Sequence, residues 1–240
     1  ISLLADQKKK NSSLVVVPRS LLFNWAAEIE KFCPSLTYII HHGPNRGDDI
    51  EELVKRNLII STYDTTAADI ELFRDFRFNY IILDESQAIK NPDSKRYKAM
   101  RLLQSDNKIA MTGTPIENNT FDLFAQLSFT SPGLLGSKTS FRNNFAIPID
   151  SNGDQEAANL LRKLIHPFIL RRTKEQVASD LPEKTETVLY CDMAAPQRKL
   201  YNKLKKQIKL DIEEEVEEKG LAKSKFKILD GLLRLRQMCN

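Results

Sequence analysis

Cysteine is scarce in this 240-residue chain, and its three copies lie far apart in the sequence. They are Cys33, Cys191 and Cys239, and no Cys-x-x-Cys pair occurs. An odd number of widely separated cysteines argues against a disulfide framework and against a zinc site. The three histidines are not spaced as metal ligands either. We therefore expect the protein to work in a reducing, intracellular compartment.

Long apolar runs are also missing. No apolar segment approaches the ~20 residues that a membrane-spanning helix needs, so we expect no membrane partner. Residues 1–6 contain no basic region and no initiator methionine, so they lack the pattern of a signal peptide. They resemble the middle of a helix, and we expect the chain to be a fragment of a longer protein.

The composition is that of an ordinary globular protein, with 41% hydrophobic, 28% charged and 8% aromatic residues. The net charge of +4 is weak evidence for a polyanionic partner, but its location is informative. Residues 196–240 contain 12 Lys and Arg against 7 Asp and Glu, a net +5 that leaves −1 for the rest. Any basic surface is therefore local.

Five short apolar segments recur in the first half of the chain. They span 14–17, 38–40, 58–62, 80–84 and 108–112. Continuous rather than alternating apolar runs are typical of strands buried on both faces. Helical patterns lie between them, at 21–32 after a possible Ser20 cap, at 50–56 after Asp48, and at 94–103. This alternation predicts an α/β fold, a mostly parallel sheet with helices on both faces.

The second half of the chain has a different pattern. A helix is predicted at 121–129, followed by helices and loops up to Leu170. Residues 185–191 read as one isolated strand. A long helix is predicted from Pro196 to a stop at Gly220, and a last helix from about Ser224 to Cys239.

Two adjacent carboxylates, Asp84 and Glu85, end the fourth predicted strand. Ligands of open α/β sheets bind at the carboxyl ends of the strands. In nucleotide-hydrolysing motors the first carboxylate can hold Mg²⁺ through water, and the second can activate the attacking water. Taken alone, an Asp-Glu pair is more often a solvated strand end that caps the next turn.

A small hydroxyl-rich turn, Thr112-Gly113-Thr114, ends the fifth predicted strand. It could hydrogen-bond a neighbouring carboxylate and move when phosphate leaves. Alternatively it is an ordinary strand-to-helix turn with Thr114 as the cap. Polar residues also follow two other strands, at 18–20 and at 61–64. Each segment is weak alone, but together they predict one polar sheet edge and favour a site there.

A basic segment, Arg171-Arg172-Thr173-Lys174, follows the apolar residues 167–170. Cations on an apolar anchor suit phosphate binding. A solvated helix face is an equally good interpretation.

Taken in order, these segments resemble the Swi/Snf-type ATPases of helicase superfamily two. The resemblance is carried by LVVVPRSLLFNW (14–25), IISTYD (59–64), IILDESQAIKN (81–91), AMTGTPIENN (110–119), PFILRRTKEQV (167–177), LPEKTE (181–186) and LRLRQMCN (233–240). It runs in family order from near residue 3 to the end. The segments 81–91, 110–119 and 167–186 are highly specific in combination.

The resemblance implies an ATP-dependent translocase or remodeller that moves along double-stranded DNA. It implies a RecA-like lobe over 1–125 and an all-helical protrusion over 126–182. It further implies a strand over 183–195 returning to the first sheet, and helices at the start of a second lobe over 196–240. ATP and Mg²⁺ are the implied cofactors, and a nucleoprotein or polymerase is a possible further partner. The implied compartment is the nucleoid-containing cytoplasm in a prokaryote or the nucleus in a eukaryote.

The resemblance also implies roles for individual residues. Asp84 would hold Mg²⁺ through water, and Glu85 would activate water. Gln87, at a position where relatives often have histidine, would couple the site with Thr112, Gly113 and Thr114. The implied DNA contacts are Pro18, Arg19, Ser20, Ser61, Thr62, Tyr63, Arg171, Arg172 and Lys174.

One family feature is not found. No Gly-x-x-x-x-Gly-Lys-[Ser/Thr] phosphate-binding loop occurs in the chain, and by resemblance it should lie just before Ile1. The second lobe should follow Asn240. We therefore expect the 240 residues alone neither to hydrolyse ATP nor to bind it tightly.

Two other functions remain open on the sequence alone. One is a degenerate, non-hydrolysing lobe that only grips DNA or a protein. The other is a metal-dependent phosphoesterase built on Asp84 and Glu85, which needs further carboxylate or histidine ligands at the strand ends.

Overall fold

The structure is a computed structural model that describes residues 11–113, 120–172, 176, 187–221 and 223–239. The chain falls into two compact units, 1–171 and 172–240, and each is described by itself. Within the described residues, no helix combines the length and the apolarity that a membrane crossing requires.

The first unit is built on a five-stranded sheet with the order β2-β3-β1-β4-β5, in which every neighbouring pair is parallel. The strands are β1 Ser13–Val17, β2 Tyr38–His41, β3 Leu58–Thr62, β4 Arg77–Leu83 and β5 Gln104–Ala110. The predicted α/β class and all five strands are therefore confirmed. Two strands are displaced toward the N-terminus: β4 spans 77–83 rather than 80–84, and β5 spans 104–110 rather than 108–112.

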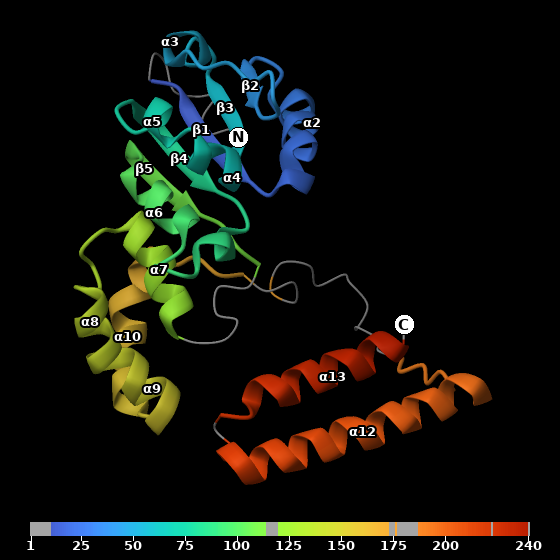
Figure 1. The fold of residues 1–240 in the computed structure, drawn as a ribbon. Coiled ribbons are helices and arrows are strands. Elements are labelled where there is room, and N and C mark those ends of the chain that lie inside the picture. The colour runs from blue at the N-terminus through green and yellow to red at the C-terminus, as the bar shows by residue number, and fades with distance from the viewer. Residues whose placement is uncertain (1–10, 114–119, 173–175, 177–186, 222, 240) are drawn as a thin grey trace. The chain divides into compact units, whose positions relative to one another are not determined.

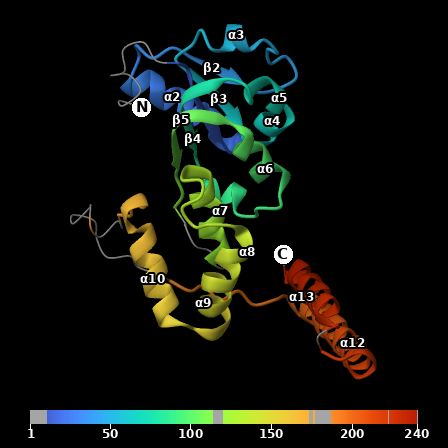
Figure 2. The same ribbon diagram turned by 90° about the vertical axis from the view of Figure 1, so that its left-hand side faces the viewer.

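Successive residues of the central strand β1 enter two different cores, because side chains alternate across a sheet. Leu14 and Val16 belong to a core formed with α3 (Ile50–Leu53), α4 (Tyr63–Ala68), α5 (Ile70–Phe73), α6 (Lys95–Leu102) and α7 (Thr120–Thr130), whereas Val15 and Val17 pack against α2 (Leu22–Phe32). Figure 2 shows α2 on one side of the sheet and α4, α5 and α6 on the other. All four side chains have no exposed surface, which explains why their pattern is a continuous apolar run.

The connecting helices fill both faces of the sheet (Figure 1). They are η1 Arg19–Leu21, α2 Leu22–Phe32, α3 Ile50–Leu53, α4 Tyr63–Ala68, α5 Ile70–Phe73, η2 Ser86–Ile89 and α6 Lys95–Leu102. Ser94 caps α6 by accepting from the Tyr97 N–H. Two predicted caps were wrong by one position: Leu21 rather than Ser20 precedes α2, and Asp49 rather than Asp48 caps α3. The sequence did not predict α4 and α5.

Helix α7, Thr120–Thr130, joins this sheet to a helical extension. One of its faces adds Ala125 and Phe129 to the core under the sheet. Its other face adds Leu123, Phe124 and Leu127 to a separate apolar core. That second core is completed by α8 Lys138–Phe141, the π-helical turn Arg142–Ala146, α9 Ile147–Asn152 and α10 Gln155–Ile165, which η4 His166–Phe168 follows. The predicted boundary at 125/126 thus falls inside a continuous helix that serves both cores.

The second unit contains the two predicted helices, α12 Ala195–Lys219 and α13 Lys225–Cys239. The strand predicted at 185–191 is not found in its described part, because residues 187–194 have no regular structure and Val188, Leu189 and Tyr190 are exposed. A strand needs a partner to satisfy its backbone hydrogen bonds, and an apolar composition does not supply one. Residues 185 and 186 lie outside the described residues.

Candidate functional site

The polar segments predicted from the sequence meet at the carboxyl edge of the sheet. Val17 pairs with Thr62, Val16 with Leu83, and Leu83 with Ala110, so the ends of β3, β1, β4 and β5 are level. Neighbouring strands lie about 4.8 Å apart. The segments that follow these strands therefore form one row along the edge, as the sequence predicted.

The acidic pair begins where β4 ends. Asp84 and Glu85 are partly exposed, between the buried Leu83 and the buried Ser86. Glu85 has a backbone φ of 48°, and it is the single non-glycine residue with positive φ in the described parts of the chain. A left-handed conformation is unfavourable for a residue with a Cβ and is concentrated at functional sites. The backbone thus turns sharply at Glu85, directly after the strand.

Asp84 is held from two sides. The indole Nε1–H of Trp25, on α2, donates to its Oδ2 at 2.8 Å. The hydroxyl of Tyr63, at the start of α4, donates to its main-chain oxygen at 2.8 Å. The N–H of Glu85 donates to its Oδ1 at 2.9 Å. Since each carboxylate oxygen can accept more than one hydrogen bond, both stay able to bind a further donor or a hydrated cation.

Glu85 is linked by side chains to the turn after β5. The amide Nε2 of Gln87 donates to Glu85 Oε2 at 2.8 Å, and the hydroxyl of Thr112 donates to Gln87 Oε1 at 2.8 Å. The backbone reinforces this link, because the N–H of Ser86 donates to the Met111 oxygen at 2.9 Å. A shift of the turn at Thr112 would therefore move Gln87 and change the position of the Glu85 carboxylate.

The sequence predicted that the acidic pair and the hydroxyl turn lie together, and the structure brings them together through Gln87. Gly113 is exposed beside Thr112, while Thr114 lies outside the described residues. Burial raises the pKa of the Tyr63 phenol, and the charges of Asp84 and Glu85 raise it further. Tyr63 therefore remains a neutral donor to the main-chain oxygen of Asp84 at neutral pH.

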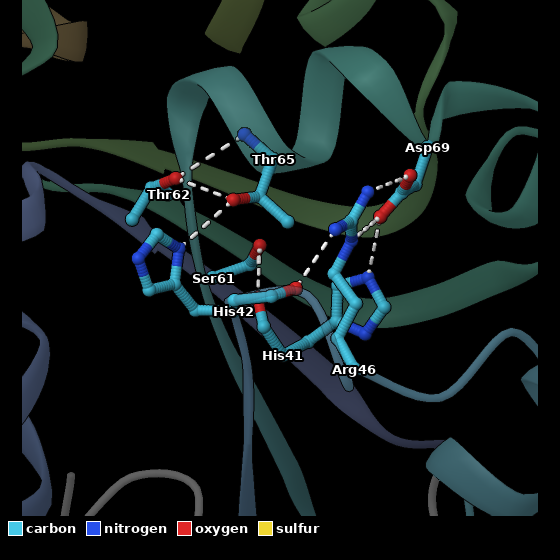
Figure 3. Close-up of polar contacts among 8 residues, drawn as sticks. His41, His42, Arg46, Ser61, Thr62, Thr65 and Asp69 are labelled. Carbon is cyan, nitrogen blue, oxygen red and sulfur yellow. Dashed lines mark hydrogen bonds and ion pairs between the residues drawn. The ribbon is translucent and has the colours of Figure 1, made fainter.

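Three of the predicted DNA contacts have buried side chains. Ser61, Thr62 and Tyr63 are 0%, 5% and 3% exposed. Ser61 donates to the His41 oxygen, and Thr62 donates to the Thr65 hydroxyl while it caps α4. Figure 3 shows Ser61 and Thr62 directed at these neighbours. Side-chain contact between these three residues and DNA therefore requires a rearrangement of this edge.

The network of Figure 3 also fixes the loop after β2. Asp69 accepts from the Nε and Nη2 atoms of Arg46 at 2.5 and 2.8 Å, and it contacts Nε2 of the buried His41 at 2.8 Å. Burial lowers the pKa of His41 despite its acidic partner, whereas the Arg46 guanidinium lowers the pKa of Asp69. His42 is linked to Thr65 by its Nδ1 atom at 3.0 Å.

Other predicted contact residues are accessible. Arg19 and Ser20 are exposed in η1, directly after Pro18, which is partly exposed. Arg171 and Arg172 are also exposed and have no regular structure, which excludes the solvated helix face considered for them. They lie at the junction of the two units. Lys174 lies outside the described residues.

The acidic pair fits a cation that keeps part of its water shell. Mg²⁺ in nucleotide enzymes is usually held by one or two carboxylates, with waters and substrate phosphates completing its coordination. Asp84 and Glu85 offer such oxygens on partly exposed side chains. In the portion of the chain that is described, His, Cys, Asp and Glu form no group of three that could cage a metal ion. The pair thus suits a shared, substrate-bound ion rather than an all-protein site.

The chain is similar to known proteins of one family. The family model described as "SNF2-related domain" matches residues 1–240. The chain is 37% identical to human TATA-binding protein-associated factor 172 over 253 residues, and 36% identical to an uncharacterized ATP-dependent helicase of Mycoplasma pneumoniae over 250 residues. These matches cover 95% and 99% of the chain but only 14% and 23% of those relatives.

A solved structure shares the fold. The Sulfolobus solfataricus SWI2/SNF2 ATPase core in complex with dsDNA is 38% identical, with a TM-score of 0.65. The match covers 95% of this chain and 47% of that one. The sheet and its flanking helices are therefore those of a RecA-like ATPase core.

Proposed function

Because this chain belongs to the family of SNF2-related domains, we propose that it is the first lobe of an ATP-driven motor that moves along double-stranded DNA. The observation that carries the proposal is the hydrogen-bonded path from Glu85 through Gln87 to Thr112. Such a path connects the residue expected to activate water with a turn expected to respond to phosphate release. The relative solved with dsDNA and the relatives named ATP-dependent helicases support ATP and duplex DNA as the ligands.

Each site residue then has a separate task. Asp84 would hold Mg²⁺ through water, and the bound ion would supply charge neutralisation for the nucleotide phosphates. The Glu85 carboxylate orients the attacking water and accepts its proton. Gln87 fixes the direction of that carboxylate, and Thr112 links it to the turn at 112–114. Pro18, Arg19 and Ser20, with Arg171, Arg172 and Lys174, contact the DNA backbone.

The proposal extends to the organisation of the longer protein. Residues 1–125 form most of the RecA-like lobe, 126–182 a helical protrusion, and 196–240 the start of a second lobe. The phosphate-binding loop and the rest of that second lobe come from the longer protein. The protein works on DNA in the nucleoid of a prokaryote or in the nucleus of a eukaryote, where a nucleoprotein or a polymerase could be a further partner.

The decisive experiment measures ATP hydrolysis by the longer protein with and without duplex DNA. We expect DNA to stimulate turnover, and Glu85→Gln to lower it at least about 100-fold, because general-base catalysis contributes that much. Glu85→Gln should bind DNA as the wild type does. DNA binding without any hydrolysis by the wild type would overturn the motor and identify a non-hydrolysing binding module.

The 240-residue chain by itself is expected to give no turnover in the same assay. Turnover by this chain alone, lost in Glu85→Gln, would contradict the assignment of the phosphate cradle to the longer protein.

A further inference from the structure

Two of the hydrogen bonds that hold Asp84 come from segments that follow other strands at the carboxyl edge of the sheet. Trp25 lies on α2, which continues directly from η1 with its exposed Arg19 and Ser20. Tyr63 follows Thr62 at the end of β3. Asp84 is thus the point where hydrogen bonds from both segments converge.

We propose that Trp25 is a positioning residue for the cation-binding carboxylate. In this role the indole N–H fixes the orientation of the Asp84 carboxylate through its Oδ2 atom. Binding of DNA at Arg19 and Ser20 would move α2 and thereby change this hydrogen bond. The inference rests on the proposed function, because it gives Asp84 the task of holding Mg²⁺. It adds a route by which bound DNA changes the metal site.

The geometry gives this bond strength and direction. An indole N–H is a donor only, and a hydrogen bond to a carboxylate is about twice as strong as a neutral one. The Glu85 N–H holds Oδ1 at 2.9 Å while Trp25 holds Oδ2 at 2.8 Å. Two donors on two oxygens fix the plane of the carboxylate, which one donor would leave free to rotate.

Packing fixes the position of the Trp25 indole relative to α2. Leu22, Ala26 and Ile29 bury one face of α2 in the core, and the Trp25 ring packs against the same core. The ring therefore cannot swing toward Asp84 independently of the helix. A displacement of the η1–α2 segment by a phosphate at Arg19 or Ser20 would alter the Trp25–Asp84 distance.

A direct test uses residues 1–240, in which Trp25 is the single tryptophan and gives one indole ¹H–¹⁵N resonance. We expect Asp84→Asn to move this resonance, because the donor then faces a neutral amide oxygen. An indole resonance unchanged by Asp84→Asn, in a chain with wild-type circular dichroism, would sink the inference.

A second test uses the longer protein and separates positioning from folding. Trp25→Phe keeps an aromatic ring and removes the N–H, and β-(3-benzothienyl)alanine at position 25 keeps the ring shape but replaces N–H by sulfur. Both should raise the Mg²⁺ concentration for half-maximal DNA-stimulated hydrolysis about 10-fold, the usual effect of losing a residue that orients a metal ligand. Affinity for DNA should not change.

The matched control is Phe32→Leu, an aromatic substitution at an exposed position of the same helix, which should leave the Mg²⁺ dependence unchanged. Wild-type Mg²⁺ dependence in both Trp25 variants would overturn the inference while leaving the motor intact. Full activity in Glu85→Gln would instead overturn the proposed function itself.

Discussion

At the scale of single residues, the site depends on Asp84 and Glu85 and also on side chains that link these acids to neighbouring segments by hydrogen bonds. Gln87 uses both ends of its amide, donating to Glu85 and accepting from Thr112. An amide is well suited to this position because one planar group carries a donor and an acceptor.

The first prediction concerns this bridge. Gln87→Ala and Thr112→Val each remove one end of it, and each should lower DNA-stimulated ATP hydrolysis by the longer protein about 10-fold while DNA binding persists. Because both substitutions break the same path, the double variant should be little worse than either single variant. Steady-state hydrolysis with saturating duplex measures all three. Losses that multiply in the double variant would show that Gln87 and Thr112 act independently.

The second prediction concerns pH and stability. Burial lowers the pKa of His41 below its ordinary value of 6.5, so the folded protein keeps His41 neutral where the unfolded chain binds a proton. Stability should therefore be constant above about pH 6.5 and fall as the pH drops below it, by at most about 1.4 kcal/mol per pH unit. Asp69 acts in a separate window, because its lowered pKa makes stability fall only as the pH drops below about 3.8.

Urea unfolding across these two pH ranges measures the effect, with His41→Gln as the test variant. This variant should lose stability overall but show a flatter profile below about pH 6.5, because its side chain does not titrate. His42→Gln, which leaves the Asp69 contact intact, serves as the control and should keep the wild-type slope. An unchanged slope in His41→Gln would assign the pH dependence to another group.

At the scale of helices and strands, the local sequence pattern predicted the five buried strands. It failed for elements that depend on a cap or on pairing with another strand. The five strands were predictable because runs such as 14–17 are apolar on both faces. Helix α4 was missed because its Y-D-T-T-A-A sequence has little helical periodicity, and its Thr62 cap stabilises it instead. The predicted strand at 185–191 had the right composition, but no neighbouring strand pairs with its described residues.

The site shows the same division. Asp84, Glu85 and Thr112 were identified because they lie at the ends of recognisable strands, whereas Gln87 was identified through the family resemblance. The Trp25–Asp84 bond joins residues 59 positions apart, and it exists because the sheet order puts β1 beside β4 and thereby brings α2 over the end of β4. Sequence order alone does not give strand order, so this contact could not be predicted.

The third prediction concerns the helix pair α12–α13. At Gly231 an added Cβ would lie 2.5 Å from Ile208 Cγ2 and 3.5 Å from Ile212 Cδ1. Replacing a helical glycine by alanine normally stabilises by about 1 kcal/mol, but here the close approach should reverse the sign. Hydrogen exchange of peptides from 195–239 should be faster in Gly231→Ala. It should be nearly unchanged in Leu232→Ala, an exposed neighbour.

Combining Gly231→Ala with Ile208→Ala tests whether the clash with Ile208 causes the destabilisation, because the second substitution removes the methyl group that the new Cβ would meet. The double variant should be less destabilised than the sum of the two single variants. Slower exchange in Gly231→Ala alone would show that the helices have room for the added methyl group.

At the scale of the whole molecule, the exposed cations fit the proposed binding to the DNA backbone. The net charge is only +4, but exposed cations at Arg19, Arg171 and Arg172 occupy two separate segments of the chain. Binding through such cations releases counterions from DNA and carries no sequence information. The longer protein should therefore bind unrelated duplexes with similar affinity.

The last prediction follows from counterion release. Each arginine that neutralises one phosphate adds about 0.9 to the slope of log affinity against log salt. Arg19→Ala, Arg171→Ala and Arg172→Ala should each lower that slope by about this amount, equally for any DNA sequence. Lys31→Ala, which removes an exposed cation at the other end of α2, should leave the slope unchanged. A slope that falls with Lys31→Ala but not with Arg19→Ala would place the DNA away from the carboxyl edge of the sheet. It would thereby separate DNA binding from the acidic pair that the motor needs.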